Sequence, residues 1–280
     1  MNVLIIGAGR VGGSMAYLMQ KNGMKVMGVY NSSEESSKNA VEFIGSGSVI
    51  NDETLYDIIS ELDFILITTP DDVIAEVANN IVKNYKIKEN TCIMHMSGIL
   101  PANIIEYDNI ISLHPLQTVV NWEEGIKLLP NSVFTLEGTD KGIKYGKLIA
   151  DLLNLNYHLI DSNYKSLYHA AAVMSSNYFI TLINLSYKLL DKSNILNKDL
   201  KKGILTLVKG AVNNLEKMDP EEALTGPIKR GDIQSIKRHQ KALEKYPEIL
   251  DIYNIMGKET ASMINKDEIL ELFNNRRGNI

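Results

Sequence analysis

Apolar and polar positions follow two different patterns along this chain of 280 residues. Up to about residue 160, short and nearly continuous apolar runs alternate with segments whose apolar residues recur at helical spacing. The runs predicted as strands are 3–6, 25–30, 63–69, 91–96, 110–113, 133–136 and 157–160, and the helices between them include 54–61, 73–85 and 141–153. This alternation predicts an α/β region built on a doubly wound parallel sheet.

Beyond residue 161 the pattern is helical throughout, without strand-like runs of period two. The predicted helices are 162–191, 198–218, 232–245, 247–264 and 266–274. We therefore expect a Rossmann-type domain over residues 1–160 and an all-helical domain over residues 161–280. The stretch 170–187 carries no charge and is near the length of a membrane span, but its Ser, Thr and Asn residues favour a helix buried within or between subunits.

A glycine-rich turn follows the first apolar run and precedes the first amphipathic segment. The spacing G-x-G-x-x-G in this strand–turn–helix context is the fingerprint of a dinucleotide-binding site. Gly7 allows the tight turn, Gly9 lets the backbone approach a pyrophosphate, and Gly12 lets the helix pack closely on the strand. The diphosphate would sit at the N-terminus of the helix, where backbone N–H groups are unpaired. The motif residues expected to bind the cofactor are Gly7, Gly9, Arg10, Val11 and Gly12.

The end of the second strand indicates which dinucleotide is bound. NAD sites usually place an acid there to accept a bond from the ribose 2′-hydroxyl, whereas this chain has Asn31, Ser32 and Ser33. Hydroxyl and backbone N–H groups could bind a 2′-phosphate, so we expect NADP(H). No Arg follows the strand, and Arg10 or Lys38 would have to take its place as the partner of the phosphate.

Other polar residues follow the later strands of the predicted sheet, at the edge where ligands bind in such folds. Thr69, Pro70 and Ser97 are expected to contact the cofactor, and the run HPLQT supplies His114 and Gln117 as candidates for substrate binding. Asp71 and Asp72 are expected to cap the helix that follows Pro70.

The helix predicted from residue 162 carries Lys165 and His169 four residues apart, with Asn177 farther along roughly the same face. A Lys and a His on one face could give a proton to a carbonyl oxygen as hydride reaches its carbon. The alternative is a solvent-facing Lys and a His packed among alanines. Farther on, Thr225 and Arg230 lie in a loop bounded by glycines, and their side chains could bind a carboxylate. The alternative is an ordinary turn between two helices. Asp232 is expected to cap the helix that follows.

Composition and charge narrow the class of protein. The net charge of −5 disfavours non-specific nucleic-acid binding. The single cysteine, Cys92, excludes an intrachain disulfide and lies in an apolar run, where a buried structural thiol is expected. No motif suggests a metal. Because the first strand begins at the N-terminus, we expect no signal peptide, no membrane association and a cytoplasmic location.

The segments GAGRVG, HPLQT, YHAAAVMSSNY and LTGPIKRGD, in this order, resemble bacterial Rossmann-like proteins with a C-terminal DUF2520 domain. That family is similar to the 6-phosphogluconate dehydrogenase-type superfamily, which includes ketopantoate reductases, pyrroline-5-carboxylate reductases and β-hydroxyacid dehydrogenases. In ketopantoate reductases and β-hydroxyacid dehydrogenases the corresponding helix carries Lys-x-x-x-Asn, with Lys as proton donor. Lys165 matches that Lys, while His169 stands where Asn is expected. The segment HPLQT also resembles the His-Pro turn of prephenate dehydrogenases.

The resemblance implies an NADPH-dependent reductase of a small 2-oxo acid, with ketopantoate (2-dehydropantoate) favoured. Lys165, helped by His169, would donate the proton, and the helical domain would bind substrate and form a homodimer. The expected substrate-binding residues are His114, Gln117, Asn177, Thr225 and Arg230. Two alternatives stay open. One is an enzyme acting on a C=N bond or a cyclic acid, as in pyrroline-5-carboxylate or prephenate chemistry, and the other is a non-catalytic dinucleotide sensor.

Overall fold

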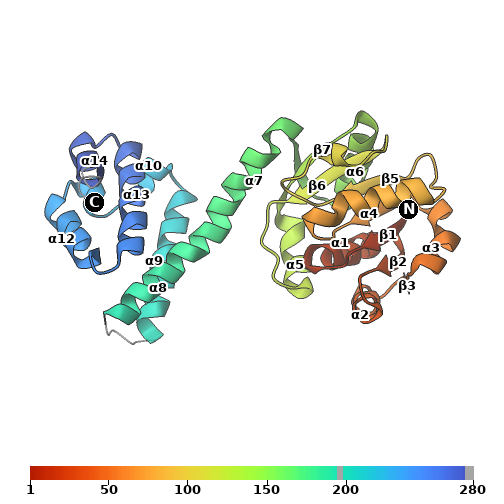
Figure 1. Cartoon of the computed structure of the whole chain (residues 1–280), viewed down its shortest axis with the longest axis horizontal. Helices are drawn as coiled ribbons and strands as arrows, with labels where there is room; N and C mark the ends of the chain where they lie inside the picture. The colour runs from red at the N-terminus through yellow and green to blue at the C-terminus, as the bar shows by residue number, and fades with distance from the viewer. Residues whose placement is uncertain (194–197, 275–280) are drawn as a thin grey trace. The chain divides into compact units, whose positions relative to one another are not determined.

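A computed structural model describes residues 1–193 and 198–274 of the chain (Figure 1). The chain forms two compact units, Met1–Asn177 and Tyr178–Ile280. The first holds the sheet and the second is helical in its described residues, so the expected fold class is confirmed. The units divide inside the long helical segment that follows the last strand, and the functions expected for residues 1–160 and 161–280 stay predictions.

The first unit is built on one sheet of eight strands in the order β3-β2-β1-β4-β5-β6-β7-β8. The strands are β1 Asn2–Ile6, β2 Lys25–Tyr30, β3 Ser48–Val49, β4 Phe64–Ile67, β5 Cys92–His95, β6 Ile110–Pro115, β7 Val133–Gly138 and β8 Asn156–Leu159. All pairs are parallel except β6 with β7, which is antiparallel. The expectation of a wholly parallel sheet was therefore wrong at this pair. The apolar runs predicted every strand except β3, which is only two residues long.

Helices cover both faces of this sheet because alternate strand residues point to opposite sides. The helices of the unit are α1 Arg10–Lys21, α2 Glu34–Ile44, α3 Asp52–Ile58, α4 Asp71–Asn84, α5 Trp122–Leu128, α6 Asp140–Leu152 and α7 Lys165–Val173. Val3 and Ile5 pack in a core that includes residues of α1, α2 and α6. Leu4 and Ile6 pack in a second core with residues of α3 and α4. Cys92 is fully buried, as expected, and burial raises the pKa of its thiol.

The start of α4 differs from its prediction. Pro70 occupies the N-cap position, and no side chain caps the helix. Asp71 and Asp72 lie within the first turn instead. There their negative charges still interact favourably with the positive end of the helix.

The long helix predicted over 162–191 is interrupted. The 3₁₀ turn Ser162–Tyr164 precedes α7, a π-helical turn spans Met174–Tyr178, and α8 follows as Phe179–Lys192. Within the chain the apolar side chains of this stretch are largely exposed: Met174 by 65% and Ile180 by 64%. Burial within one subunit is therefore wrong for these side chains, and burial between subunits stays a prediction.

The second unit contains α8 and six further helices in its described residues. They are α9 Lys198–Leu215, α10 Pro220–Ala223, α11 Pro227–Arg230, α12 Ile233–Leu243, α13 Pro247–Met263 and α14 Asp267–Asn274. Ile236, Ala261, Ile269 and Phe273 form its small buried core. The Asp232 carboxylate accepts a bond from the Ser235 N–H and caps α12, as predicted. Among the described residues, no helix is long and apolar enough to cross a membrane.

Candidate functional site

A cavity of about 550 Å³ opens at the carboxyl ends of β1, β2 and β4. Six of the expected cofactor residues line it: Gly7, Gly9, Asn31, Ser32, Thr69 and Pro70. Thr68, which lies at the strand end expected to face the ligand, also lines the cavity, as do Tyr30 and Glu76. Arg10, Val11, Gly12, Ser33 and Ser97 are not part of its lining.

The three motif glycines play distinct roles in the geometry of this cavity. Gly7 adopts a φ of +84°, which strongly favours glycine. A Cβ on Gly12 would overlap the Thr68 hydroxyl and lie 2.6 Å from the Gly7 carbonyl oxygen, so this position packs helix against strand as predicted. A Cβ on Gly9 would meet nothing within 4 Å. The backbone at Gly9 is therefore open to a ligand.

The end of β2 is polar, but its groups are partly engaged within the chain. The Asn31 Oδ1 atom accepts a 2.6 Å bond from the Ala8 N–H and joins this strand end to the glycine turn. The Ser33 hydroxyl caps α2 by accepting a bond from Ser36. Lys38 forms an exposed ion pair with Glu34 at 2.7 Å. Ser32 is exposed and lines the cavity, which makes it the best placed hydroxyl for a ribose substituent.

A second cavity of about 450 Å³ lies at the end of β6, against α7. It is lined by His114, Gln117 and Asn177, three of the expected substrate-binding residues, and by His169. Tyr168 adds a phenol, and Thr118, Ser175 and Ser176 add hydroxyl groups. The ends of β1, β4, β5 and β6 share one edge of the sheet because these neighbouring strands are parallel. The two cavities therefore open along the same edge.

Three side chains of the second cavity can carry protons. His114 Nδ1 lies 2.9 Å from the Tyr168 hydroxyl, and the His114 and His169 rings approach edge to face with centroids 6.2 Å apart. Burial, with smaller effects of Lys165 and His169, lowers the pKa of His114 to about 4. Burial also raises the pKa of Tyr168 above its ordinary value. At neutral pH this pair is therefore an uncharged imidazole and an uncharged phenol that share a hydrogen bond.

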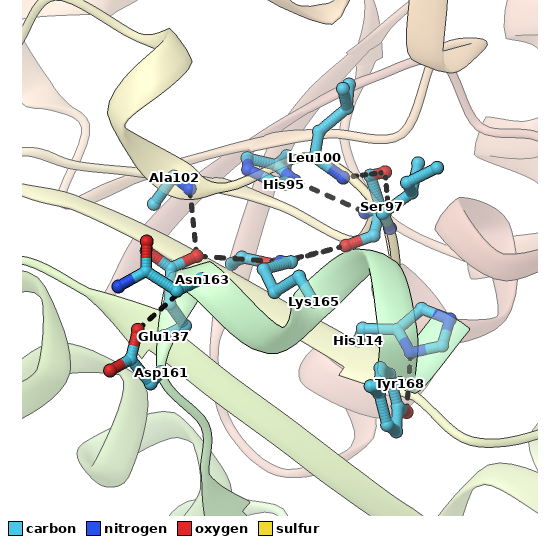
Figure 2. Close-up of polar contacts among 12 residues, drawn as sticks. His95, Ser97, Leu100, Ala102, His114, Glu137, Asp161, Asn163, Lys165 and Tyr168 are labelled. Atoms are coloured by element: carbon cyan, nitrogen blue, oxygen red, sulfur yellow. Dashed lines mark hydrogen bonds and ion pairs between the residues drawn. The ribbon is translucent and has the colours of Figure 1, made fainter. Parts of the chain in front are cut away.

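Lys165 is not part of the lining of this cavity, and its side chain contacts polar groups of the neighbouring strands and loop (Figure 2). Its side chain is almost fully buried, and its Nζ atom donates to the Ser97 carbonyl oxygen at 3.2 Å and to the Ser112 hydroxyl. It also forms an ion pair with Glu137 Oε2 at 3.5 Å. Burial lowers the pKa of Lys165, although the Glu137 carboxylate acts in the opposite direction.

Ser97 and His95 contribute to the loop that follows β5. The Ser97 hydroxyl accepts bonds from the N–H groups of Ile99 and Leu100, so it points into its own loop. His95 is fully buried, and its Nδ1 atom accepts a bond from the Ser97 N–H. Burial lowers the pKa of His95 to about 3, so its imidazole is uncharged at neutral pH.

Thr225 and Arg230 belong to the second unit. Arg230 ends α11 with an exposed side chain, and Gly226 adopts a φ of +94° in the turn that separates α10 from α11. Their role as a clamp for a carboxylate stays a prediction. No group of three or more His, Cys, Asp or Glu side chains among residues 1–193 and 198–274 could hold a metal ion.

Sequence reasoning did not find Ser112, Glu137 and Tyr168. Ser112 and Glu137 lie inside strands, where a single polar residue gives no motif. They meet because β6 and β7 pair with Ser112 directly opposite Glu137. Tyr168 could have been found, because it lies between Lys165 and His169 on a helix and three residues from Lys165.

Comparisons with solved structures support the fold. The chain is similar to protein TM1727 from Thermotoga maritima, with 25% identity, coverage of 98% of this chain and 100% of the other, and a TM-score of 0.73. A protein from Bacteroides fragilis assigned as an NADP oxidoreductase shares 22% identity over 93% of this chain and 98% of its own, with a TM-score of 0.74. Pyrroline-5-carboxylate reductase from Streptococcus pyogenes shares 17% identity over 97% and 98%, with a TM-score of 0.61.

No curated protein matches the chain. Two family models do match it, and they cover different parts. Residues 1–110 match the Rossmann-like domain, and residues 132–260 match a domain of unknown function, DUF2520. The chain therefore combines a Rossmann-like domain with a DUF2520 domain, in the order that its motifs predicted.

Proposed function

We propose that this chain is an NADPH-dependent reductase of a small 2-oxo acid, with ketopantoate as the favoured substrate. The observation that carries the proposal is the pair of cavities along one edge of the sheet. One suits a dinucleotide, and the other brings the proton-carrying groups His114, Tyr168 and His169 together.

The residues of the first cavity fit a dinucleotide. Gly9 leaves the backbone open ahead of α1, a helix of twelve residues whose first N–H groups favour an anion. The Thr69 hydroxyl is buried beside the cavity and makes no hydrogen bond within the described part of the chain. The similarity to the Bacteroides fragilis protein assigned as an NADP oxidoreductase agrees with NADP(H).

The second cavity suits reduction of a carbonyl group. Bound NADPH supplies the hydride that reaches the carbonyl carbon, and one proton must reach the carbonyl oxygen to give the 2-hydroxy acid. The His114–Tyr168 pair and His169 line the cavity and can hold that oxygen and deliver the proton. The other polar lining groups are uncharged donors such as Gln117 and Asn177, which can bind the substrate carboxylate. Arg230 and Thr225 remain candidates for binding the substrate carboxylate.

The test follows the absorbance of NADPH as it is oxidised in the presence of ketopantoate, other 2-oxo acids or cyclic imines. Cyclic hydroxy acids are tested in the opposite direction, by the reduction of NADP⁺. A clear preference for ketopantoate is the expected result. Preference for a cyclic imine or acid would instead establish the second candidate, which is favoured by the His114-Pro115 pair at the end of β6, because the segment HPLQT resembles that of prephenate dehydrogenases. Cofactor binding without turnover on any compound would identify a dinucleotide sensor.

The choice of NADPH over NADH gives a prediction at the end of β2. The variant Ser32→Asp should weaken binding of NADPH by at least about tenfold, because a carboxylate beside a 2′-phosphate adds like-charge repulsion of more than about 1.4 kcal/mol. Binding of NADH should change less, since an acid can accept a bond from its 2′-hydroxyl. Fluorescence titration of both cofactors measures the two effects. The variant Ser32→Asn is the control, because asparagine has nearly the size of aspartate but carries no charge. Equal losses for both cofactors in Ser32→Asp would place the phosphate elsewhere.

A further inference from the structure

Lys165 and Glu137 form a buried ion pair that has no role in the proposed function as stated above. Their exposed fractions are 1% and 8%, and neither residue lines either cavity of the proposed site. Burying two charges is costly unless they are paired and hydrogen-bonded. A pair retained at this place in the fold therefore requires an explanation.

The contacts of the pair converge on one short segment of backbone. Lys165 Nζ donates to the carbonyl oxygen of Ser97, and Glu137 Oε2 accepts a 2.9 Å bond from the N–H of Ala102 (Figure 2). Ser112 Oγ adds a second bond to the Ser97 carbonyl at 3.2 Å. The pair thus holds both ends of the segment Ser97–Ala102, which leaves the carboxyl end of β5.

This segment supports the two imidazoles of the second cavity. A Cβ placed on Gly98 would lie 2.7 Å from His114 Nε2 and 2.8 Å from His169 Cδ2. Both rings therefore rest against the bare backbone of Gly98. Any displacement of the segment would move the surface on which His114 and His169 sit.

The contacts of Lys165 also bear on its own chemistry. An ammonium group has three N–H donors, and Lys165 has three acceptors: the Ser97 carbonyl, the Ser112 hydroxyl and the Glu137 carboxylate. A proton donor must come within hydrogen-bond reach of the atom that it protonates. Lys165 could do so only by giving up at least one of these partners.

We propose that Lys165 and Glu137 are positioning residues, which hold the Ser97–Ala102 segment and through it the His114 and His169 rings in the arrangement used for proton transfer. This proposal rests on the proposed function for its effect on turnover. Lys165 then does not protonate the substrate itself, and the proton comes from the groups that line the cavity.

A double-mutant cycle tests the proposal with Lys165→Met, Glu137→Gln and the double variant. Each single variant should lower kcat by about 100-fold, the scale expected when reacting groups are displaced by about 1 Å, while NADPH affinity stays unchanged. The double variant should recover much of this loss, because it leaves no buried charge without a partner. If Lys165 were the proton donor, the double variant would be as inactive as Lys165→Met, and Glu137→Gln would retain most of its activity. That outcome would overturn the proposal.

A second readout is independent of turnover. Amide hydrogen exchange of the peptide that contains residues 97–105 should become faster in each single variant and return toward the native rate in the double variant. The variant Lys144→Met, which removes an exposed lysine from α6, is the matched control and should leave exchange and activity unchanged. Native exchange in both single variants would overturn the proposal even if the protein reduced none of the compounds tested. If the native protein turned over none of the compounds but the variants showed the predicted exchange pattern, only the proposed function would be refuted. Glu137→Gln removes the charge that pairs with Lys165, so this variant carries the exchange test by itself if Lys165→Met does not fold.

Discussion

The variant Gly12→Ala is expected to lose about 3 kcal/mol of folding free energy before any ligand is added, at the upper end of the cost of overpacking a core. Its new methyl group would overlap the Thr68 hydroxyl, and it would lie 2.6 Å from the carbonyl oxygen of Gly7. Thr68 donates its hydroxyl to that same carbonyl, so it cannot turn away without breaking this hydrogen bond. Urea unfolding of the ligand-free protein measures the loss.

The matched control is Gly9→Ala, three residues earlier in the same motif. Gly9 has a φ of −68°, which alanine adopts easily, and its methyl group would meet nothing within 4 Å. Its stability should therefore stay within about 1 kcal/mol of the native value. Its affinity for NADPH should nevertheless fall by about tenfold or more, because the methyl group would keep the charged diphosphate from the backbone N–H groups. Unchanged affinity would show that the diphosphate does not approach Gly9.

The variant His114→Phe is expected to lower turnover by about 10²–10⁴-fold, the range for loss of a group that transfers a proton in the rate-limiting step. Phenylalanine keeps a flat ring of similar size but removes both nitrogens, including Nδ1, which lies 2.9 Å from the Tyr168 hydroxyl. Binding of NADPH should not change, because His114 does not line the cofactor cavity. Steady-state kinetics with parallel cofactor titration make the measurement.

Two companion measurements sharpen this prediction. Tyr168→Phe removes only the hydroxyl of the pair and should lower turnover in the same direction. Because burial holds the pKa of His114 near 4 and raises that of Tyr168, neither group changes charge between about pH 5 and pH 9. Titration of this pair should therefore cause no change in the turnover of the native enzyme between about pH 5 and pH 9. A fully active His114→Phe variant would remove this imidazole from the mechanism.

The sequence predicted those features of the first unit that depend on a short motif or on the end of a strand. Gly7 and Gly12 do what their motif required, and His114 and Gln117 lie on the cavity expected at the end of β6. These positions were predictable because their roles depend on local backbone geometry and on the edge of a parallel sheet.

Other features depended on contacts between distant residues. The direction of β7 was missed, because alternation of apolar residues marks a strand without showing which way it runs. The burial of Lys165 was missed for a related reason: its carboxylate partner is Glu137, which lies on a strand with no motif around it. Asp71 and Asp72 were expected to cap α4 because acids favour helix starts, but Pro70 takes the cap position.

The antiparallel pairing of β7 with β6 has a consequence for how this protein can vary. Side chains of β7 alternate, so Phe134 and Leu136 enter the core on one face while Glu137 points to the other. A slip of one residue would move both apolar side chains to the opposite face of the sheet and turn the carboxylate away from Lys165. The packing of Phe134 and Leu136 on one face of β7 therefore fixes the position of the Glu137 carboxylate on the other face. A change in the size of Phe134 could act on catalysis from the far side of the sheet.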